Sequence, residues 1–216
     1  MSLASTLQMV FGTNARFTSP ASRVLPAGTQ IREFRSTDRE GCLRIYRDNE
    51  PGRFPSGVVP YFENFLARND YLKLVCCKDE EPIAVGGIGV INGLLSLQAW
   101  LVFGLVAPSY QRQGVGTTLL LARLAALPTP GKPIRLLLSN VPGSGGFFAR
   151  FGFALQGQMT VPAHGQRIDV CSAMLDAVGW NTCRRLVGDL GMELGTLRVP
   201  EIDLDARSPN NRWRGP

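Results

Sequence analysis

The sequence predicts an α/β fold with a mixed, mostly antiparallel central sheet of about six or seven strands, flanked by helices. Three apolar runs, at 71–77, 83–91 and 97–106, follow one another with only short turn-like breaks between them. This pattern is typical of three consecutive antiparallel strands joined by hairpins. The second run contains Gly-Gly-Ile-Gly at 86–89, which predicts a bulge or a close backbone approach. Beyond Pro108 helix and strand patterns alternate, which favours a sheet covered by helices.

The remaining elements follow from capping and turn signals. Ser36 or Thr37 can cap a helix that ends near Asp48. Residues 49–60 cannot form one helix because prolines interrupt them. Gly152 is placed to close a short helix in a left-handed conformation. The other predicted elements, in chain order, are a strand at 31–34, a helix at 61–68, the three strands above, a helix at 114–127, a strand at 134–139, a helix at 144–151 and strands at 153–160 and 167–175.

Length and composition predict one domain with extensions at both ends. The 216 residues, 44% of them apolar, are enough for one core and too few for two ordinary domains. We expect a flexible tail at 1–29, one domain at 30–176, and a C-terminal helix and tail at 177–216 that packs on the domain or on a partner. Because residues 1–29 contain no acid and many Ser and Thr, an organelle transit segment is the alternative there. The C-terminal helix is predicted by apolar residues at spacings of three and four, namely Trp180, Cys183, Val187, Leu190 and Leu194.

The charge pattern disfavours nucleic acid as a partner, and the lengths of the apolar runs disfavour a membrane. The net charge is +6, but the basic residues of the central part are scattered among acids. A nucleic-acid groove normally needs clustered Lys and Arg, whereas a mild basic excess also suits a phosphorylated cofactor. No apolar run approaches the roughly 20 residues needed to span a bilayer. A homodimer contact by the C-terminal helix stays open as the alternative to packing on its own core.

The cysteines predict a reducing, cytoplasmic compartment and no metal site. The chain has five cysteines, an odd number, and no C-x-x-C pair. Cys76 and Cys77 are neighbours in a predicted strand, so they should point to opposite faces of the sheet. The single histidine, His164, has no cluster of metal ligands around it in the sequence.

Residues 105–119 predict a site for phosphate or pyrophosphate. They run from a strand through a turn into the start of a helix, where unpaired N–H groups favour anions. Gly114 and Gly116 lack side chains, so an anion can approach those amides closely. A P-loop would need a Gly-Lys-Ser/Thr run that is missing here, and a dinucleotide motif would need a glycine in place of Leu119.

Two segments carry a resemblance to a known family. Residues 111–116 (QRQGVG) resemble the Q/R-x-x-G-x-G/A signature of the GNAT acetyltransferases, and residues 147–153 (FFARFGF) are similar to that family's F-Y-x-x-x-G-F segment. The resemblance covers roughly residues 30–175. It implies a GNAT-like fold, acetyl-CoA as co-substrate, and acetyl transfer to a primary amine of a small molecule or peptide by direct attack on the thioester. A non-catalytic acyl-CoA-binding sensor or partner-binding module on the same fold is the alternative.

The resemblance also implies which residues bind the cofactor. Backbone amides from Gln111 to Thr117 would hold the pyrophosphate, and the backbone of Leu105 and Val106 would pair with the pantetheine arm. An amide there would polarise the thioester carbonyl. The sheet is expected to splay between the strands at 97–106 and 134–139. The residues implied in cofactor binding are Leu105, Val106, Gln111, Arg112, Gln113, Gly114, Val115, Gly116, Thr117, Asn140 and Phe148.

The sequence departs from the family pattern in its catalytic groups. Phe148 stands where the family usually has a tyrosine, and a phenyl ring cannot protonate the departing CoA thiolate. The strand at 97–106 has no acid to serve as base. The catalytic residues are therefore unknown. The candidate bases are Glu50, Glu63, Asp70 and His164.

The loop at 49–60 and the helix after it occupy the place where the family's acceptor site lies. Arg53, Phe54, Tyr61 and Phe62 would then shape acceptor selectivity. An arginine beside aromatic rings suits an acceptor with a carboxylate.

Overall fold

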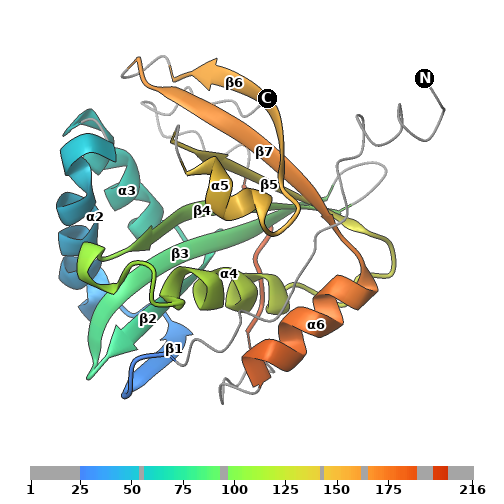
Figure 1. Ribbon diagram of the computed structural model, residues 1–216, viewed down its shortest axis with the longest axis horizontal. Coiled ribbons are helices and arrows are strands. Elements are labelled where there is room, and N and C mark those ends of the chain that lie inside the picture. Colours follow the sequence, from blue (N-terminus) through green and yellow to red (C-terminus); the bar gives the residue numbers. More distant parts are fainter. Residues whose placement is uncertain are drawn as a thin grey trace.

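A single seven-stranded sheet forms the centre of the computed structural model, which describes residues 25–53, 56–92, 97–141, 144–161, 165–188 and 197–203 (Figure 1). The strand order is β1-β2-β3-β4-β5-β7-β6, and only β4 and β5 pair in parallel. The predicted mixed, mostly antiparallel sheet is confirmed. The strands are β1 (Thr29–Glu33), β2 (Leu72–Lys78), β3 (Glu81–Asn92), β4 (Leu97–Val106), β5 (Ile134–Asn140), β6 (Ala154–Thr160) and β7 (Arg167–Leu175).

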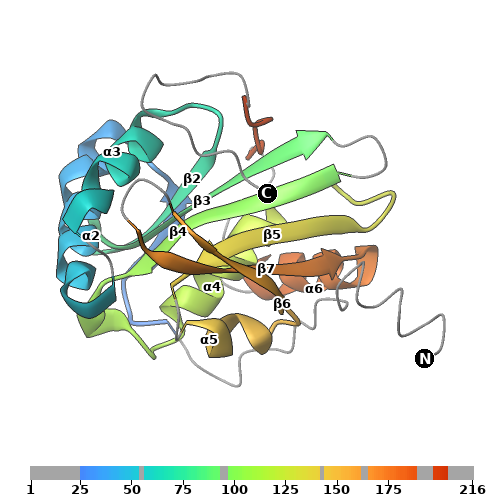
Figure 2. The same cartoon turned by 90° about the horizontal axis from the view of Figure 1, so that it is seen from above.

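Helices cover both faces of the sheet and bury two separate apolar cores (Figures 1 and 2). The first two helices pack on one face, where Tyr46, Phe62 and Leu105 are among the buried side chains. The larger core lies on the other face, beneath the helix at 115–125 and the last helix. None of the helices in the described ranges has the length and apolar character needed to cross a membrane. The helices are α2 (Arg39–Arg53), α3 (Val59–Ala67), α4 (Val115–Ala125), α5 (Gly145–Ala149) and α6 (Ala177–Gly188).

The adjacent cysteines Cys76 and Cys77 show how β2 divides its side chains between the two cores. Cys76 belongs to the core under α4, and Cys77 belongs to the core under α2 and α3, as the alternation of a strand predicts. All five cysteines are free and buried. Burial raises the pKa of the Cys42, Cys76 and Cys183 thiols to about 12. These thiols are therefore protonated and unreactive in the native fold.

The glycines of β3 make room for side chains from other parts of the chain. A Cβ at Gly87 would lie 2.4 Å from the Phe65 ring, and one at Gly89 would lie 2.5 Å from Ile202. Ile202 reaches this position because its N–H donates to the carbonyl of Val90, at 2.7 Å. The predicted bulge is also confirmed, since the β3–β4 register shifts between Val85 and Gly87.

Helix α2 ends five residues later than its predicted end near Asp48. It runs through Pro51 to Arg53, although proline removes one helical hydrogen bond. Asn49 explains the difference, because this buried side chain donates to the carbonyls of Ile45 and Val106, at 2.8 and 3.1 Å. A tertiary contact with β4 thus overrides the local turn signal. Residues 49–60 still do not form one helix, as predicted.

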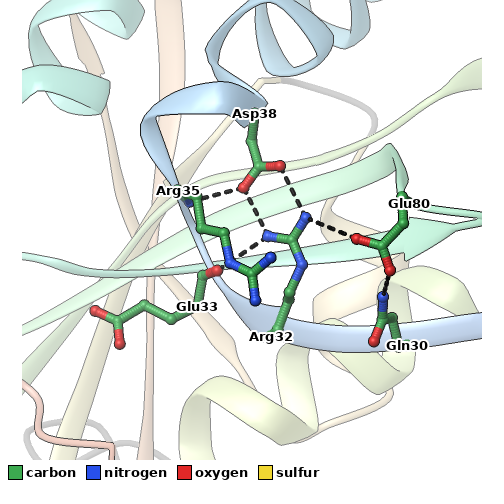
Figure 3. A network of polar contacts seen from close by, with 6 residues as sticks. All are labelled: Gln30, Arg32, Glu33, Arg35, Asp38 and Glu80. Carbon is green, nitrogen blue, oxygen red and sulfur yellow. Dashed lines mark hydrogen bonds and ion pairs between the residues drawn. The ribbon is translucent and has the colours of Figure 1, made fainter.

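A bidentate ion pair holds the turn between β1 and α2 (Figure 3). Arg32 donates from both Nη atoms to the carboxylate of Asp38, at 2.7 and 2.9 Å. The backbone N–H of Arg35 donates to the same carboxylate at 2.7 Å. Asp38 thus takes the capping role that we expected of Ser36 or Thr37. Burial raises the pKa of Asp38, but the hydrogen bonds from Arg32 and Arg35 outweigh it, so the net pKa is lowered.

Replacing Asp38 by asparagine is expected to lower the free energy of unfolding by about 2–3 kcal/mol at pH 7, because it leaves a largely buried guanidinium with only the exposed Glu80, 3.8 Å away, as an ion-pair partner. A lowered carboxyl pKa stabilises the fold above the unfolded value of about 4, and this contribution is lost as the pH falls through the folded pKa. Urea unfolding at several pH values should show the difference from wild type shrinking below about pH 4. Glu80→Gln, at an exposed partner of the same Arg32, is the control and should change stability by less than about 0.5 kcal/mol.

Candidate active site at the open edge of β4

Strands β4 and β5 separate partway along their length, which opens one edge of β4. Their pairing covers only Gln98–Leu101 of β4 with Arg135–Leu138 of β5. Strand β4 continues through Val106 without β5 beside it. The splay implied by the family resemblance is confirmed. The backbone between 102 and 106 therefore has one edge that β5 does not satisfy.

Helix α4 begins directly beyond this edge with a row of unpaired amides. Its N-cap, Gly114, has a left-handed backbone with φ of 89°, and Arg112 also has a positive φ of 61°. The N–H of Thr118 donates to the carbonyl of Gly114 at 3.0 Å, as the first bond of the helix. The amides of Val115, Gly116 and Thr117 precede that bond and have no helical carbonyl to receive them. The turn into α4 thus presents several N–H groups together with the positive end of the helix dipole.

The missing side chain of Gly116 faces the gap between the end of β4 and α5. A Cβ there would lie 3.4 Å from Val106 and 3.9 Å from the ring of Phe147. Phe147 contacts Phe148 edge to face, with ring centroids 4.9 Å apart. Gly116 therefore lies between the elements that flank the open edge, which is where a ligand reaching from the α4 amides to β4 would pass.

The backbone carbonyl of Val106 already accepts hydrogen bonds from two side-chain amides. Asn49 of α2 and Gln111 of the turn both donate to it, each at 3.1 Å, and the Gln111 side chain also donates to the side-chain Oδ1 of Asn49 at 3.0 Å. The neighbouring N–H of Ala107 donates to Ile83 of β3, so the Val106 peptide groups point to the open edge. A carbonyl has two lone pairs, so of the two groups at Val106 the N–H is the one left for a ligand. Asn49 could not be identified from the sequence, because it lies in the segment 49–60, which we expected to be a loop.

The other predicted cofactor residues lie around the same edge. Leu105 is buried in the core under α2 and α3, while Arg112 and Gln113 are exposed in the turn. Gln113 donates to the carbonyl of Ser109 at 2.7 Å. Asn140 ends β5 and is buried, with its amide bonded to the Val141 carbonyl and its Oδ1 3.4 Å from the Cys171 sulfur. Its side chain is thus engaged within the protein.

Among the candidate bases, Glu50 lies on the same face of α2 as the buried Tyr46. One turn before it, Tyr46 stacks on Phe62 at 5.0 Å, and Phe62 contacts Phe103 of β4 at 5.2 Å. The Glu50 Oε1 atom is buried and accepts no hydrogen bond from the described residues. Burial raises the pKa of Tyr46, and the negative charge of Glu50 raises it further.

The other candidates are engaged elsewhere or lie outside the described residues. Glu63 pairs with Arg39 at 3.3 Å, and its side chain is 40% exposed. Asp70 pairs with Arg68 and accepts the N–H of Asp203. Burial raises the pKa of Asp70, but Arg68 more than offsets this, so the pKa is lowered and the group is a weak base. His164 lies outside the described residues. Across the described ranges, no three His, Cys, Asp or Glu side chains gather as a metal site.

The residues expected to shape acceptor selectivity differ in burial, and the side chains of two of them lie outside the described part of the chain. Phe62 is fully buried against Tyr46, so its ring does not line a surface that an acceptor could reach. Its ring is used to pack α3 on α2 and β4. Tyr61 is half-buried, and the side chain of Arg53 and residue Phe54 lie outside the described part.

Comparison with known proteins places this geometry in a family. A model of the "Acetyltransferase (GNAT) family" matches residues 39–153, which include β4, the turn and α4. No curated protein sequence matches the chain.

Several solved structures share the fold. The ribosomal-protein-S18-alanine N-acetyltransferase from Escherichia coli is 20% identical, with a TM-score of 0.52 over 68% of this chain and 94% of that one. The PaiA N-acetyltransferase from Thermoplasma acidophilum, solved in complex with coenzyme A, is 17% identical, with a TM-score of 0.52 over 67% and 98%. FeeM, an N-acyl amino acid synthase from uncultured soil microbes, is 14% identical, with a TM-score of 0.55 over 76% and 98%. Because the family model covers more than half of its 216 residues, the chain belongs to the GNAT acetyltransferase family.

Proposed function

We propose that this protein is an acetyl-CoA-dependent N-acetyltransferase that moves an acetyl group to a primary amine of a small molecule or peptide. The observation that carries the proposal is the open edge of β4 directly beside the unpaired amides of α4. The coenzyme A complex of the PaiA enzyme, which has the same fold, supports it. A cytoplasmic location is part of the proposal, because all five cysteines are free and buried.

Each part of the site has a role in this proposal. The amides from Arg112 to Thr117 bind the pyrophosphate, since the N–H of Gln111 already donates to the Pro108 carbonyl at 3.3 Å, and the N–H of Val106 pairs with the pantetheine arm. Acetyl-CoA supplies an acetyl group that its thioester activates toward amines. Glu50 accepts the proton that the amine must lose before or during attack, because a free alkyl ammonium has a pKa near about 10.4.

A non-catalytic acyl-CoA-binding module is the second candidate. Phe148 favours it, because its ring offers no proton to a departing thiolate. The two functions differ in one measurable respect. A binding module would bind acetyl-CoA but release no free CoA with any of a broad panel of amines, whereas an enzyme would release it with at least one.

Acetyl-CoA is expected to raise the melting temperature of the protein. A ligand present at 100 times its dissociation constant adds roughly 2.7 kcal/mol, which for a chain of this length corresponds to a rise of about 5–10 °C. Differential scanning fluorimetry with acetyl-CoA measures the shift, and pantetheine, which lacks the pyrophosphate, is the control and should give little shift. No shift at millimolar acetyl-CoA would contradict both candidate functions.

A further inference from the structure

Arg123 of α4 is a buried cation without an acidic partner among the described residues. Its exposed fraction is 3%, and no Asp or Glu in those ranges forms an ion pair with it. Its hydrogen bonds to the described residues are long ones to backbone carbonyls, from Nε to Leu119 at 3.3 Å and from Nη1 to Gly87 at 3.4 Å. Burial alone lowers the pKa of Arg123, to about 10, so the group keeps its charge at neutral pH. A buried charge with such weak partners is costly, and a fold keeps it where it has a use.

Two glycines make room for the Arg123 guanidinium beneath the sheet. A Cβ at Gly86 of β3 would lie 3.0 Å from its Cζ and Nη1 atoms, and a Cβ at Gly104 of β4 would lie 3.1 Å from Nη2. A side chain at either position would force the guanidinium to move by a few tenths of an ångström. The guanidinium therefore packs against β3 and β4 at these two glycines.

That point is the bulge in the open stretch of β4. Gly86 stands opposite two residues of β4, Phe103 and Gly104, because the register shifts there. Phe103 adopts a positive φ of 46°. One residue of such a bulge has no ladder partner on the opposing strand, so a backbone group is left unpaired. Gly104 is exposed, and it lies beyond the last residue of β4 that pairs with β5. Solvent or a ligand thus reaches the backbone directly above the buried cation.

We propose that Arg123 supplies the positive charge that stabilises negative charge on the reacting thioester at the β4 bulge. This inference rests on the proposed function, because it assumes that the acyl group lies at the open edge of β4. Arg123 acts through its field from beneath Gly104 rather than by contact, so it is a positioning residue.

The reaction places negative charge at two atoms near this cation. The amine nitrogen forms a bond to the thioester carbon, and the carbonyl oxygen takes up the displaced electron pair. When the carbonyl re-forms, the carbon–sulfur bond breaks and its electron pair leaves on sulfur as the CoA thiolate. The proton from the amine passes to a base, and the thiolate takes a proton from water. Phe148 cannot donate that proton. Stabilisation of the thiolate by a fixed cation is therefore more important here than in an enzyme with a tyrosine at this position.

The first test needs no turnover. Affinities of CoA and of desulfo-CoA, which lacks the thiol, are measured by calorimetry from pH 6 to pH 9. A free thiol titrates near about 8.5, so a cation near the bound sulfur should lower its pKa and make the affinity ratio of CoA to desulfo-CoA rise up to about tenfold with pH. Arg123→Met should bind desulfo-CoA like wild type but give a ratio that does not rise. Arg123→Lys should keep the rise.

The second test separates a chemical role from a structural one. Arg123→Met removes a buried charge, and should leave the melting temperature unchanged or higher, since an apolar side chain of similar length fills the space. We expect kcat to fall about 10- to 100-fold with little change in KM for acetyl-CoA, and Arg123→Lys to restore part of it. Lys73→Met is the matched control, because Lys73 is also a buried cation that donates to backbone carbonyls, those of Leu66 and Arg68. It should leave kcat unchanged.

The outcomes distinguish this inference from the proposed function. If neither CoA nor desulfo-CoA binds, the cofactor site itself is refuted, and the inference with it. If both bind but the wild-type ratio is independent of pH, or if Arg123→Met shows the same rise, Arg123 has only a structural role while the cofactor site stands.

Discussion

Replacing Gly116 by leucine is expected to lower the affinity for acetyl-CoA by at least about 100-fold while the protein stays folded. The missing side chain faces the gap between Val106 and Phe147, and an isobutyl group would fill that gap and cover the amides at the start of α4. Alanine should be much milder, because its Cβ would lie at an ordinary contact distance of 3.4 Å from Val106. Isothermal titration of both variants with acetyl-CoA measures this graded loss.

A glycine in another helix provides the control for that series. Gly188, at the end of α6, has no atom within 4 Å of the position that a Cβ would take. Gly188→Leu should therefore leave acetyl-CoA affinity at the wild-type value. Wild-type affinity in Gly116→Leu, with the fold intact by circular dichroism, would show that the ligand does not pass between β4 and α5.

Replacing Glu50 by glutamine is expected to lower kcat about 100-fold near pH 7 and to leave KM for acetyl-CoA nearly unchanged. Glutamine keeps the shape of the side chain but cannot take up the amine proton at the buried Oε1 position. As the pH approaches the amine pKa of about 10, more of the acceptor is already deprotonated. The deficit of Glu50→Gln relative to wild type should therefore shrink with rising pH in a pH–rate profile.

The matched control for this prediction is Glu63→Gln. Glu63 is on the neighbouring helix, where its half-exposed side chain pairs with Arg39, so its loss should change kcat less than about twofold. Full activity in Glu50→Gln, or a pH-independent deficit, would exclude Glu50 as the base.

The strands could be predicted well from sequence because their signals are local. The bounds predicted for the strand at 97–106 match β4, and the left-handed Gly152 is confirmed by its φ of 83°. The end of α2 could not be predicted, because it depends on Asn49 contacting a strand more than fifty positions away. The pairing of Ile202 with Val90 is hidden for the same reason. Local patterns identify elements, whereas their ends depend on tertiary contacts.

In the candidate site, too, the features that are local in the sequence could be predicted and those that depend on tertiary contacts could not. The amides at Gly114 and Gly116 could be predicted, since a strand, a turn and two glycines are consecutive in the chain. The position of Arg123 could not, because the glycines that make room for it come from two other strands, at 86 and 104. Glu50 could be named only as one of several acids until the structure showed Glu63 and Asp70 engaged in ion pairs.

The five buried thiols are divided between the two cores, so their reaction with a labelling reagent can report local opening of each core. Cys42 and Cys77 lie in one core, and Cys76, Cys171 and Cys183 lie in the other. Because these thiols are buried, an alkylating reagent reaches each of them only when its layer opens. Mass spectrometry of labelled peptides would therefore time the opening of each layer separately, and a ligand that clamps β4 to α4 should slow the labelling of both.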